Sequence, residues 1–135
     1  YSIPFKIIPY KSKKYFERES LIIIKEKKIN FICLAGFLKI LSSDFIKKFG
    51  NKIVNIHPSL LPKFKGLNVH KRVLQSTEKH SGCTVHFVSS DLDSGKIIMQ
   101  KKILIKKNET ESSLSKKILN LEHKIYPLAI FSIFK

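Results

Sequence analysis

The chain has 135 residues, 43% of them hydrophobic and 27% charged, which is typical of one folded domain. It contains no apolar run near the roughly 20 residues that a membrane-spanning helix needs, and its two cysteines are too few for a disulfide framework. The net charge of +16 would suit a nucleic-acid-binding protein, but the lysines are scattered and arginine is scarce, so we favour solvated lysine faces on an ordinary globular protein.

Helix and strand patterns alternate along the chain. In chain order we expect a helix over 12–28, a strand over 29–35, a helix from Ser42 or Ser43 through Phe49, a strand over 52–56, a helix over 68–77, strands over 83–88 and 96–105, a helix from Glu111 to about His123, and an apolar helical segment from Tyr126. The run 29–35 is typical of a strand buried on both faces of a parallel sheet, and Cys33 and Cys83 are expected to be buried. This order predicts an α/β fold whose sheet is parallel in its first part.

Polar side chains gather where the strand over 52–56 ends. Because side chains alternate along a strand, Asn55 and His57 lie on the same side and meet at one point. Asp93 lies in a later loop, and a carboxylate near His57 would hold its ring in one orientation and favour its charged form. An amide and an imidazolium that face a carbonyl stabilise a tetrahedral oxyanion. Ser59 lacks the nucleophile-elbow pattern, so direct group transfer is favoured over a covalent enzyme intermediate.

The same residues also have a purely structural interpretation. An isolated Asn-x-His at the end of a strand is more often structural than catalytic. His86 is expected to be a hydrogen-bonded residue within a strand, and His80 a surface residue. No metal site is expected, because no two histidines have metal-ligand spacing and neither cysteine belongs to a Cys-x-x-Cys pair.

Several longer motifs narrow the choice. They are AGFLKIL at 35–41, NIHPSLLP at 55–62, GLNVH at 66–70, GCTVHFV at 82–88, LDSGKII at 92–98 and EHKIYP at 122–127. In this order and spacing they resemble the phosphoribosylglycinamide formyltransferases, within the folate-dependent formyltransferase family. The resemblance covers almost the whole chain. It implies a Rossmann-like α/β fold with a mostly parallel sheet flanked by helices, in a single catalytic domain over 1–135.

The resemblance also implies a chemistry. The family transfers a formyl group from 10-formyltetrahydrofolate to the amine of glycinamide ribonucleotide, in purine synthesis. Carried over, His57 would be the general acid and electrostatic stabiliser, Asn55 the oxyanion donor, and Asp93 the group that supports His57 and assists proton shuttling. The remaining implied residues are Leu38, Lys39, Ile40, Leu41, Asn55, Ser89, Ser90 and Asp91 for folate, Glu122 and His70 for the ribonucleotide, Lys63 beside the substrate channel, and His86 and Thr84 as support.

Two features depart from the family pattern. The glycine-rich loop that holds the substrate phosphate is absent, since all five glycines lie at or after Gly36. We therefore expect this chain to be the C-terminal two-thirds of a catalytic domain, without its N-terminal strands and phosphate loop. Lys65 stands where the family often has proline, so its loop is expected to be less rigid.

Rival functions exist within and outside this chemistry. Methionyl-tRNA formyltransferase and formyltetrahydrofolate deformylase share the Asn-x-His and Asp set, but Pro58 and the motifs at 85–87 and 122–127 favour the purine enzymes. Outside the enzymes of this chemistry, the chain could be a basic nucleic-acid-binding module or an inactive folate-binding remnant. With the first assignment we expect a cytoplasmic protein, a monomer or homodimer, without a nucleic-acid or membrane partner.

Overall fold

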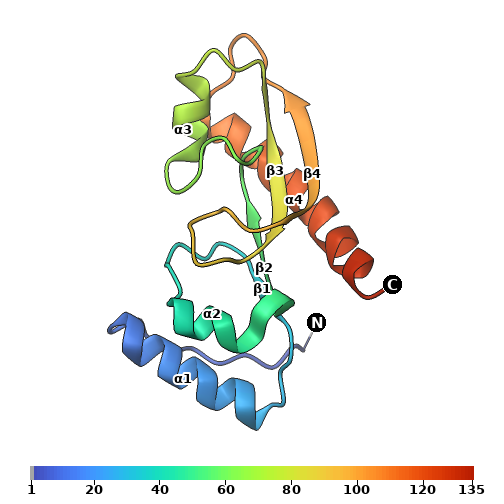
Figure 1. Cartoon of the computed structure of the whole chain (residues 1–135). Helices are drawn as coiled ribbons and strands as arrows, with labels where there is room; N and C mark the ends of the chain where they lie inside the picture. Colours follow the sequence, from blue (N-terminus) through green and yellow to red (C-terminus); the bar gives the residue numbers. More distant parts are fainter. Residues whose placement is uncertain (1) are drawn as a thin grey trace.

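A four-stranded sheet of order β1-β2-β3-β4 organises the protein, whose computed structural model describes residues 2–135 (Figure 1). The elements in chain order are α1 (Lys13–Glu26), β1 (Ile32–Leu34), α2 (Ser43–Phe49), the 3-10 turn η1 (Gly50–Lys52), β2 (Ile53–His57), α3 (Val69–Leu74), β3 (His80–Phe87), β4 (Ile97–Leu104) and α4 (Glu111–Ile133). In Figure 1, α1 and α2 lie together at one end of the molecule and α3 lies at the other, while α4 runs along the sheet. No helix within 2–135 is long and apolar enough to cross a membrane.

The sheet is mixed, which corrects the expectation of a mostly parallel one. β1 and β2 are parallel, as expected for the first part of the sheet, whereas β2 with β3 and β3 with β4 are antiparallel. For β3 and β4 the physical reason lies in their connection. Residues 88–96 join β3 to β4 without a helix, and a parallel pair would need a longer crossover connection. The α/β class with a Rossmann-like arrangement is confirmed.

All the expected helices and strands are present, and their ends lie within three residues of the expected ones. The exceptions are the strand β1, which is shorter than expected, and the last helix, which is longer. The prediction that 29–35 is buried on both faces is wrong. Only Ile32–Leu34 is a strand, and Cys33 is exposed because β1 forms the edge of the sheet that residues 2–135 build. Cys83 is fully buried, as predicted.

The last two predicted helical segments form one helix of 23 residues that runs through Pro127. A proline inside a helix removes one backbone hydrogen bond, so packing must compensate for the loss. Ile125 and Ala129, on either side of the proline, are buried, and the Tyr126 hydroxyl donates to the carbonyl of Leu34 at 2.7 Å. These contacts hold the second half of α4 against β1 and β2.

Two hydrophobic clusters meet at β2. The larger cluster joins α3, α4 and β3 to Ile56, and the smaller joins Leu41 and α2 to Ile53. Both Ile53 and Val54 are fully buried. β2 is therefore held from both sides, which fixes the position of the polar residues near its end.

Thr110→Ala is expected to lower the free energy of unfolding by about 1 kcal/mol, because it removes the cap of α4. The Thr110 hydroxyl accepts a hydrogen bond from the Ser113 N–H at 3.1 Å, and the Ser113 hydroxyl accepts one from the Thr110 N–H. Urea unfolding measures the effect. Ser112→Ala, at an exposed position of the same turn, is the matched control, with an expected change within about 0.5 kcal/mol. Equal losses in the two variants would contradict the capping role.

Candidate active site

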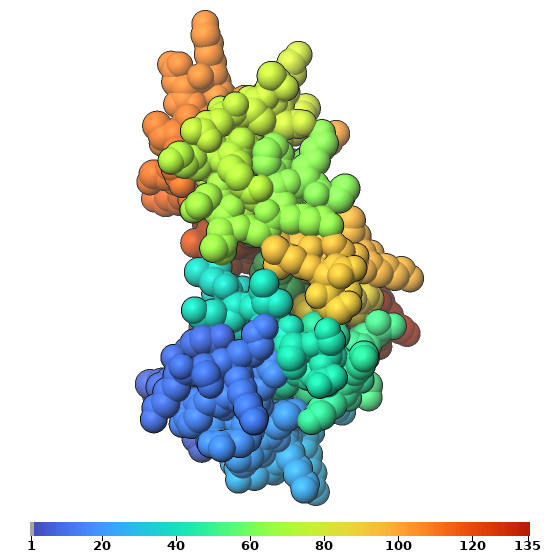
Figure 2. Space-filling view, turned by 60° about the vertical axis from the view of Figure 1, so that its left-hand side comes forward, coloured from blue at the N-terminus to red at the C-terminus, as the bar shows by residue number. Residues whose placement is uncertain are grey.

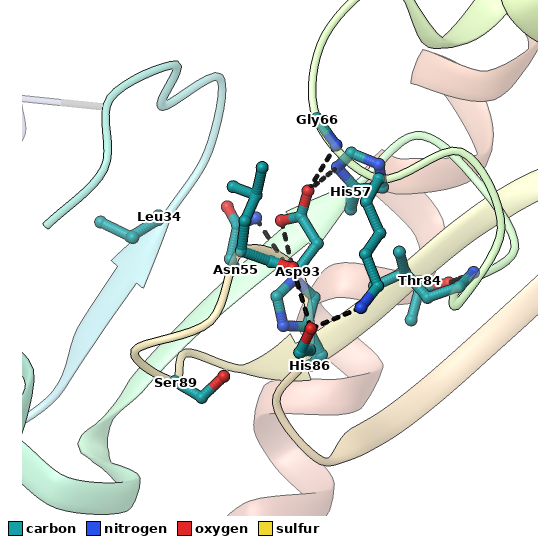
Figure 3. Close-up of polar contacts among 12 residues, drawn as sticks. Leu34, Asn55, His57, Gly66, Thr84, His86, Ser89 and Asp93 are labelled. Atoms are coloured by element: carbon teal, nitrogen blue, oxygen red, sulfur yellow. Dashed lines mark hydrogen bonds and ion pairs between the residues drawn. The ribbon is translucent and has the colours of Figure 1, made fainter.

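Four polar side chains converge beyond the centre of the sheet, as Figure 3 shows. Asn55 and His57 come from β2, His86 comes from β3, and Asp93 comes from the loop before β4. The β2–β3 register pairs Asn55 with His86, so that their side chains lie on one face. The Asn55 amide nitrogen lies 3.4 Å from His86 Nε2, and His57 Nδ1 lies 3.4 Å from Asp93 Oδ2. The structure thus brings together the three residues singled out in the sequence and His86, which was expected to support them.

Asp93 is held in place by backbone geometry. Its side chain is 9% exposed, its φ of +46° lies in the left-handed region, and Oδ2 accepts a hydrogen bond from the Gly66 N–H at 2.9 Å. The loop passes so close to the end of β3 that a Cβ on Gly95 would lie 1.7 Å from the Phe87 carbonyl oxygen. Glycine is therefore required at residue 95 for Asp93 to reach His57.

The two histidines near Asp93 make different contacts. Both ring nitrogens of His57 have an acceptor nearby, because Nε2 donates to the Phe64 carbonyl at 3.0 Å and Nδ1 lies 3.4 Å from Asp93 Oδ2. His86 Nδ1 lies 2.9 Å from the Phe87 carbonyl, so Nε2 is left to accept from the Asn55 amide. Burial holds the pKa of His86 below its ordinary value, against the opposing effects of the Phe87 carbonyl and Asp93, which favours the neutral ring.

The cluster lies on the wall of a cavity of about 560 Å³. The residues expected from the sequence that line this cavity are Leu38, Lys39, Ile40, Leu41, Asn55, His57, His70, His86, Ser89, Ser90, Asp91, Asp93 and Glu122. Figure 2 shows a hollow between the cyan segment around 36–41 and the green and gold segments above it, with the red of α4 behind. One cavity therefore gathers both expected ligand sites.

Two residues named from the sequence do not line this cavity. Lys63, expected beside the substrate channel, does not line this cavity, and its ammonium pairs with Glu78 at 2.6 Å on the exposed surface. Thr84 is fully buried and supports the loop that follows His57, as expected of a supporting residue. Its hydroxyl donates to the Ser59 carbonyl at 2.6 Å and accepts from the Leu61 N–H at 3.1 Å.

Burial at the cavity shifts the pKa of two further groups, Glu122 and His70. Burial raises the pKa of Glu122 to about 7, so this carboxyl group is partly protonated near neutral pH. Burial also lowers the pKa of His70; the charge of Glu111 opposes this shift and that of His57 adds to it. His70 Nδ1 is buried without a hydrogen-bond partner among residues 2–135. Besides the His57–Asp93 pair, the cavity therefore holds a carboxyl group and an imidazole whose charged forms are disfavoured by burial.

Sequence reasoning missed the backbone contacts and most of the α4 contribution. The Phe64 carbonyl and the Gly66 N–H were not identified, although the glycine itself marked the loop. Glu111, Ser115 and Leu119 of α4 also line the cavity. No local signal marks these three positions, because only the packing of α4 turns them toward β2.

The sequence of the chain matches one family model and several known proteins. The family model described as formyl transferase matches residues 2–130. The chain is 43% identical over 131 residues to the trifunctional purine biosynthetic protein adenosine-3 of Homo sapiens, across 95% of this chain and 13% of that protein. It is 36% identical over 121 residues to the phosphoribosylglycinamide formyltransferase of Escherichia coli (strain K12), across 90% of this chain and 57% of that protein.

Solved structures agree with this similarity. The phosphoribosylglycinamide formyltransferase of Bacillus halodurans matches with a TM-score of 0.87 at 36% identity, over 93% of this chain and 65% of that one. The enzyme of the same name from Campylobacter jejuni subsp. jejuni matches with a TM-score of 0.81 at 42% identity, over 93% and 66%. The chain spans less than two thirds of each of these four relatives.

Glu122→Gln is expected to weaken the dependence of stability on pH. A carboxyl pKa raised from 4.5 to about 7 on folding means that stability present at low pH is lost as the pH rises through about 7. The loss is at most about 3 kcal/mol. Urea unfolding at about pH 5 and about pH 8 should show a smaller difference in the variant than in the wild type. Ser115→Ala, an uncharged change on the same cavity wall, should keep the wild-type difference. An unchanged difference in Glu122→Gln would refute the assignment.

Proposed function

Because the chain belongs to the formyl transferase family, whose model matches residues 2–130, we propose that it transfers a formyl group from 10-formyltetrahydrofolate to the amine of glycinamide ribonucleotide. The observation that carries this proposal is the convergence of Asn55, His57 and Asp93 on one cavity. The names of the E. coli and B. halodurans relatives support the choice of the ribonucleotide as acceptor. A cytoplasmic location and a monomeric or homodimeric state belong to the same proposal.

The proposed reaction is a direct transfer. The amine nitrogen attacks the formyl carbon, a C–N bond forms, and the formyl oxygen becomes an oxyanion. The Asn55 amide would donate to this oxygen, and the positive charge of His57 would lower its energy. The bond from the formyl carbon to N10 of the folate then breaks. The proton that the amine loses balances the proton that N10 gains, and Asp93 beside His57 would relay it.

Two candidate nucleophiles near the cluster are unavailable, which supports direct transfer over a covalent enzyme intermediate. Ser59 is 1% exposed, and its hydroxyl donates to the Lys63 carbonyl at 2.6 Å, so it is turned away from the cavity. Cys83 is fully buried, and burial, together with the charge of Glu122, raises the pKa of its thiol to about 12. Neither group is an available anion near neutral pH.

Exposed apolar side chains at the cavity favour a flat aromatic ligand such as the pteridine of the folate. Leu38 is 73% exposed, Ile40 54% and Leu92 48%, and all three line the cavity. Large apolar side chains that rim a concave site commonly mark ligand binding. The partly protonated Glu122 would then hydrogen-bond the amine or a ribose hydroxyl of the ribonucleotide.

The full-length gene product tests the proposal. We would measure tetrahydrofolate release from 10-formyltetrahydrofolate with glycinamide ribonucleotide, with charged initiator tRNA, and with water alone. Turnover only with the ribonucleotide is the expected result. Turnover with the tRNA or with water alone would move the protein to the tRNA formyltransferases or the deformylases. Silence with all three would refute formyl transfer.

Asn55→Ala, His57→Ala and Asp93→Asn are each expected to lower kcat by about 100-fold or more, because each removes a group that stabilises the oxyanion or its partner. Circular dichroism should show that the variants remain folded. Lys63→Ala is the control, since its side chain lies outside the cavity, and its kcat should stay within about twofold of the wild type. Full activity in any of the three variants would remove that residue from the proposed mechanism.

A further inference from the structure

The loop of residues 63–68 touches both charged members of the site through its backbone. The Phe64 carbonyl accepts from His57 Nε2 at 3.0 Å, and the Gly66 N–H donates to Asp93 Oδ2 at 2.9 Å. The loop adopts a strained conformation to do so. Phe64 has a φ of +57°, which is costly for a bulky residue, and Asn68, with a φ of +55°, also lies in the left-handed region. A loop of this kind keeps its shape only where other contacts impose it.

Arg72 supplies such contacts from α3. Its guanidinium Nη2 donates to the Lys65 carbonyl at 2.5 Å, and its central carbon lies 5.9 Å from the centre of the Phe64 ring. The side chain is half-buried, and Nε is buried without a hydrogen-bond partner among residues 2–135. A buried donor left unpaired is unfavourable, so the contacts with the loop must outweigh this cost.

A second side chain ties the same loop to the loop of Asp93. The Lys65 ammonium lies 2.5 Å from the Ser94 hydroxyl, next to Asp93 in sequence. The backbone of Lys65 is therefore held by Arg72 while its side chain reaches the neighbouring loop. Together these contacts link α3 through residues 64–66 to both His57 and Asp93.

We propose that Arg72 is a positioning residue for the His57–Asp93 pair. It fixes the backbone of Phe64, Lys65 and Gly66, and through this backbone it holds the imidazole and the carboxylate in the geometry that formyl transfer needs. Arg72 does not line the cavity, so it acts without touching a ligand. The planar guanidinium is suited to this task because it donates to a carbonyl while it lies over the face of an aromatic ring, which an ammonium does poorly. The effect of Arg72 on activity rests on the proposed function. The contacts that lead from Arg72 through residues 64–66 to His57 and Asp93 do not depend on it.

Arg72→Met, compared with Lys71→Met, tests the proposal in the full-length protein. Both changes remove one positive charge from α3, but Lys71 is exposed. We expect kcat of Arg72→Met to fall by about 10- to 100-fold, with KM for both substrates within about threefold, because misplacement of the reacting groups affects the chemical step. Lys71→Met should match the wild type. Arg72→Lys, which keeps the charge and part of the reach, should recover part of kcat.

A spectroscopic measurement of the His57 ring tests the contacts between Arg72 and His57 without any enzyme activity. In protein labelled with ¹⁵N-histidine, the Nε2–H signal of His57, identified by its loss in His57→Asn, should shift in Arg72→Met and stay unchanged in Lys71→Met. An unshifted signal, or a kcat equal to that of Lys71→Met, would overturn the proposal. If Arg72→Met does not fold, wild-type values of both readouts in Arg72→Lys would overturn it. If the wild type transfers no formyl group, the proposed function fails, and the His57 signal still decides the role of Arg72.

Discussion

The antiparallel pairing of β2 with β3 is the constraint on which the candidate site depends. It places Asn55 opposite His86 and His57 opposite Thr84, so that four polar side chains share one face of two adjacent strands. The other face carries Val85 and belongs to the hydrophobic core against α4. A shift of the register of one strand by one residue would exchange its two faces, placing its polar residues in the hydrophobic core and its apolar residues on the side of the cavity. The apolar residues of these strands therefore specify the position of the polar ones.

The site combines groups that stabilise one another with groups that the fold leaves under strain. The His57–Asp93 pair is nearly buried and is satisfied by the Phe64 carbonyl and the Gly66 N–H. Asp93, by contrast, occupies the left-handed region, and Glu122 is destabilised in its charged form. Burial raises the strength of each electrostatic interaction because little water screens it. The conformation of Asp93 and the burial of Glu122 thus lower the stability of the fold at the cavity, while they hold both carboxyl groups in fixed positions.

Local patterns were sufficient for the elements and for the side-by-side placement of Asn55 and His57, because strand alternation is a property of consecutive residues. Asp93 could be named from the residues as a candidate partner of His57, but only the motif resemblance tied it to the site and added the cavity residues, whose proximity no local pattern reveals. Features that depend on distant pairing escaped prediction. Cys33 is exposed because β1 lies at the edge of the described sheet, and α4 continues through Pro127 because Tyr126 bonds to β1. The ion pair of Lys63 with Glu78 escaped prediction for the same reason, since it depends on how the loop folds back.

The periodicity of the helix α4 determines which of its residues line the cavity. Its cavity-lining residues are Glu111, Ser115, Ile118, Leu119 and Glu122. Their spacings of three and four residues keep them on one side of a helix with 3.6 residues per turn. Inserting one residue between Ser115 and Glu122 would rotate everything beyond it by about 100° and advance it by about 1.5 Å. Such an insertion would turn both Glu122 and the anchoring Tyr126 out of phase, so the length of this helix is far less free to vary in evolution than the identity of its exposed residues.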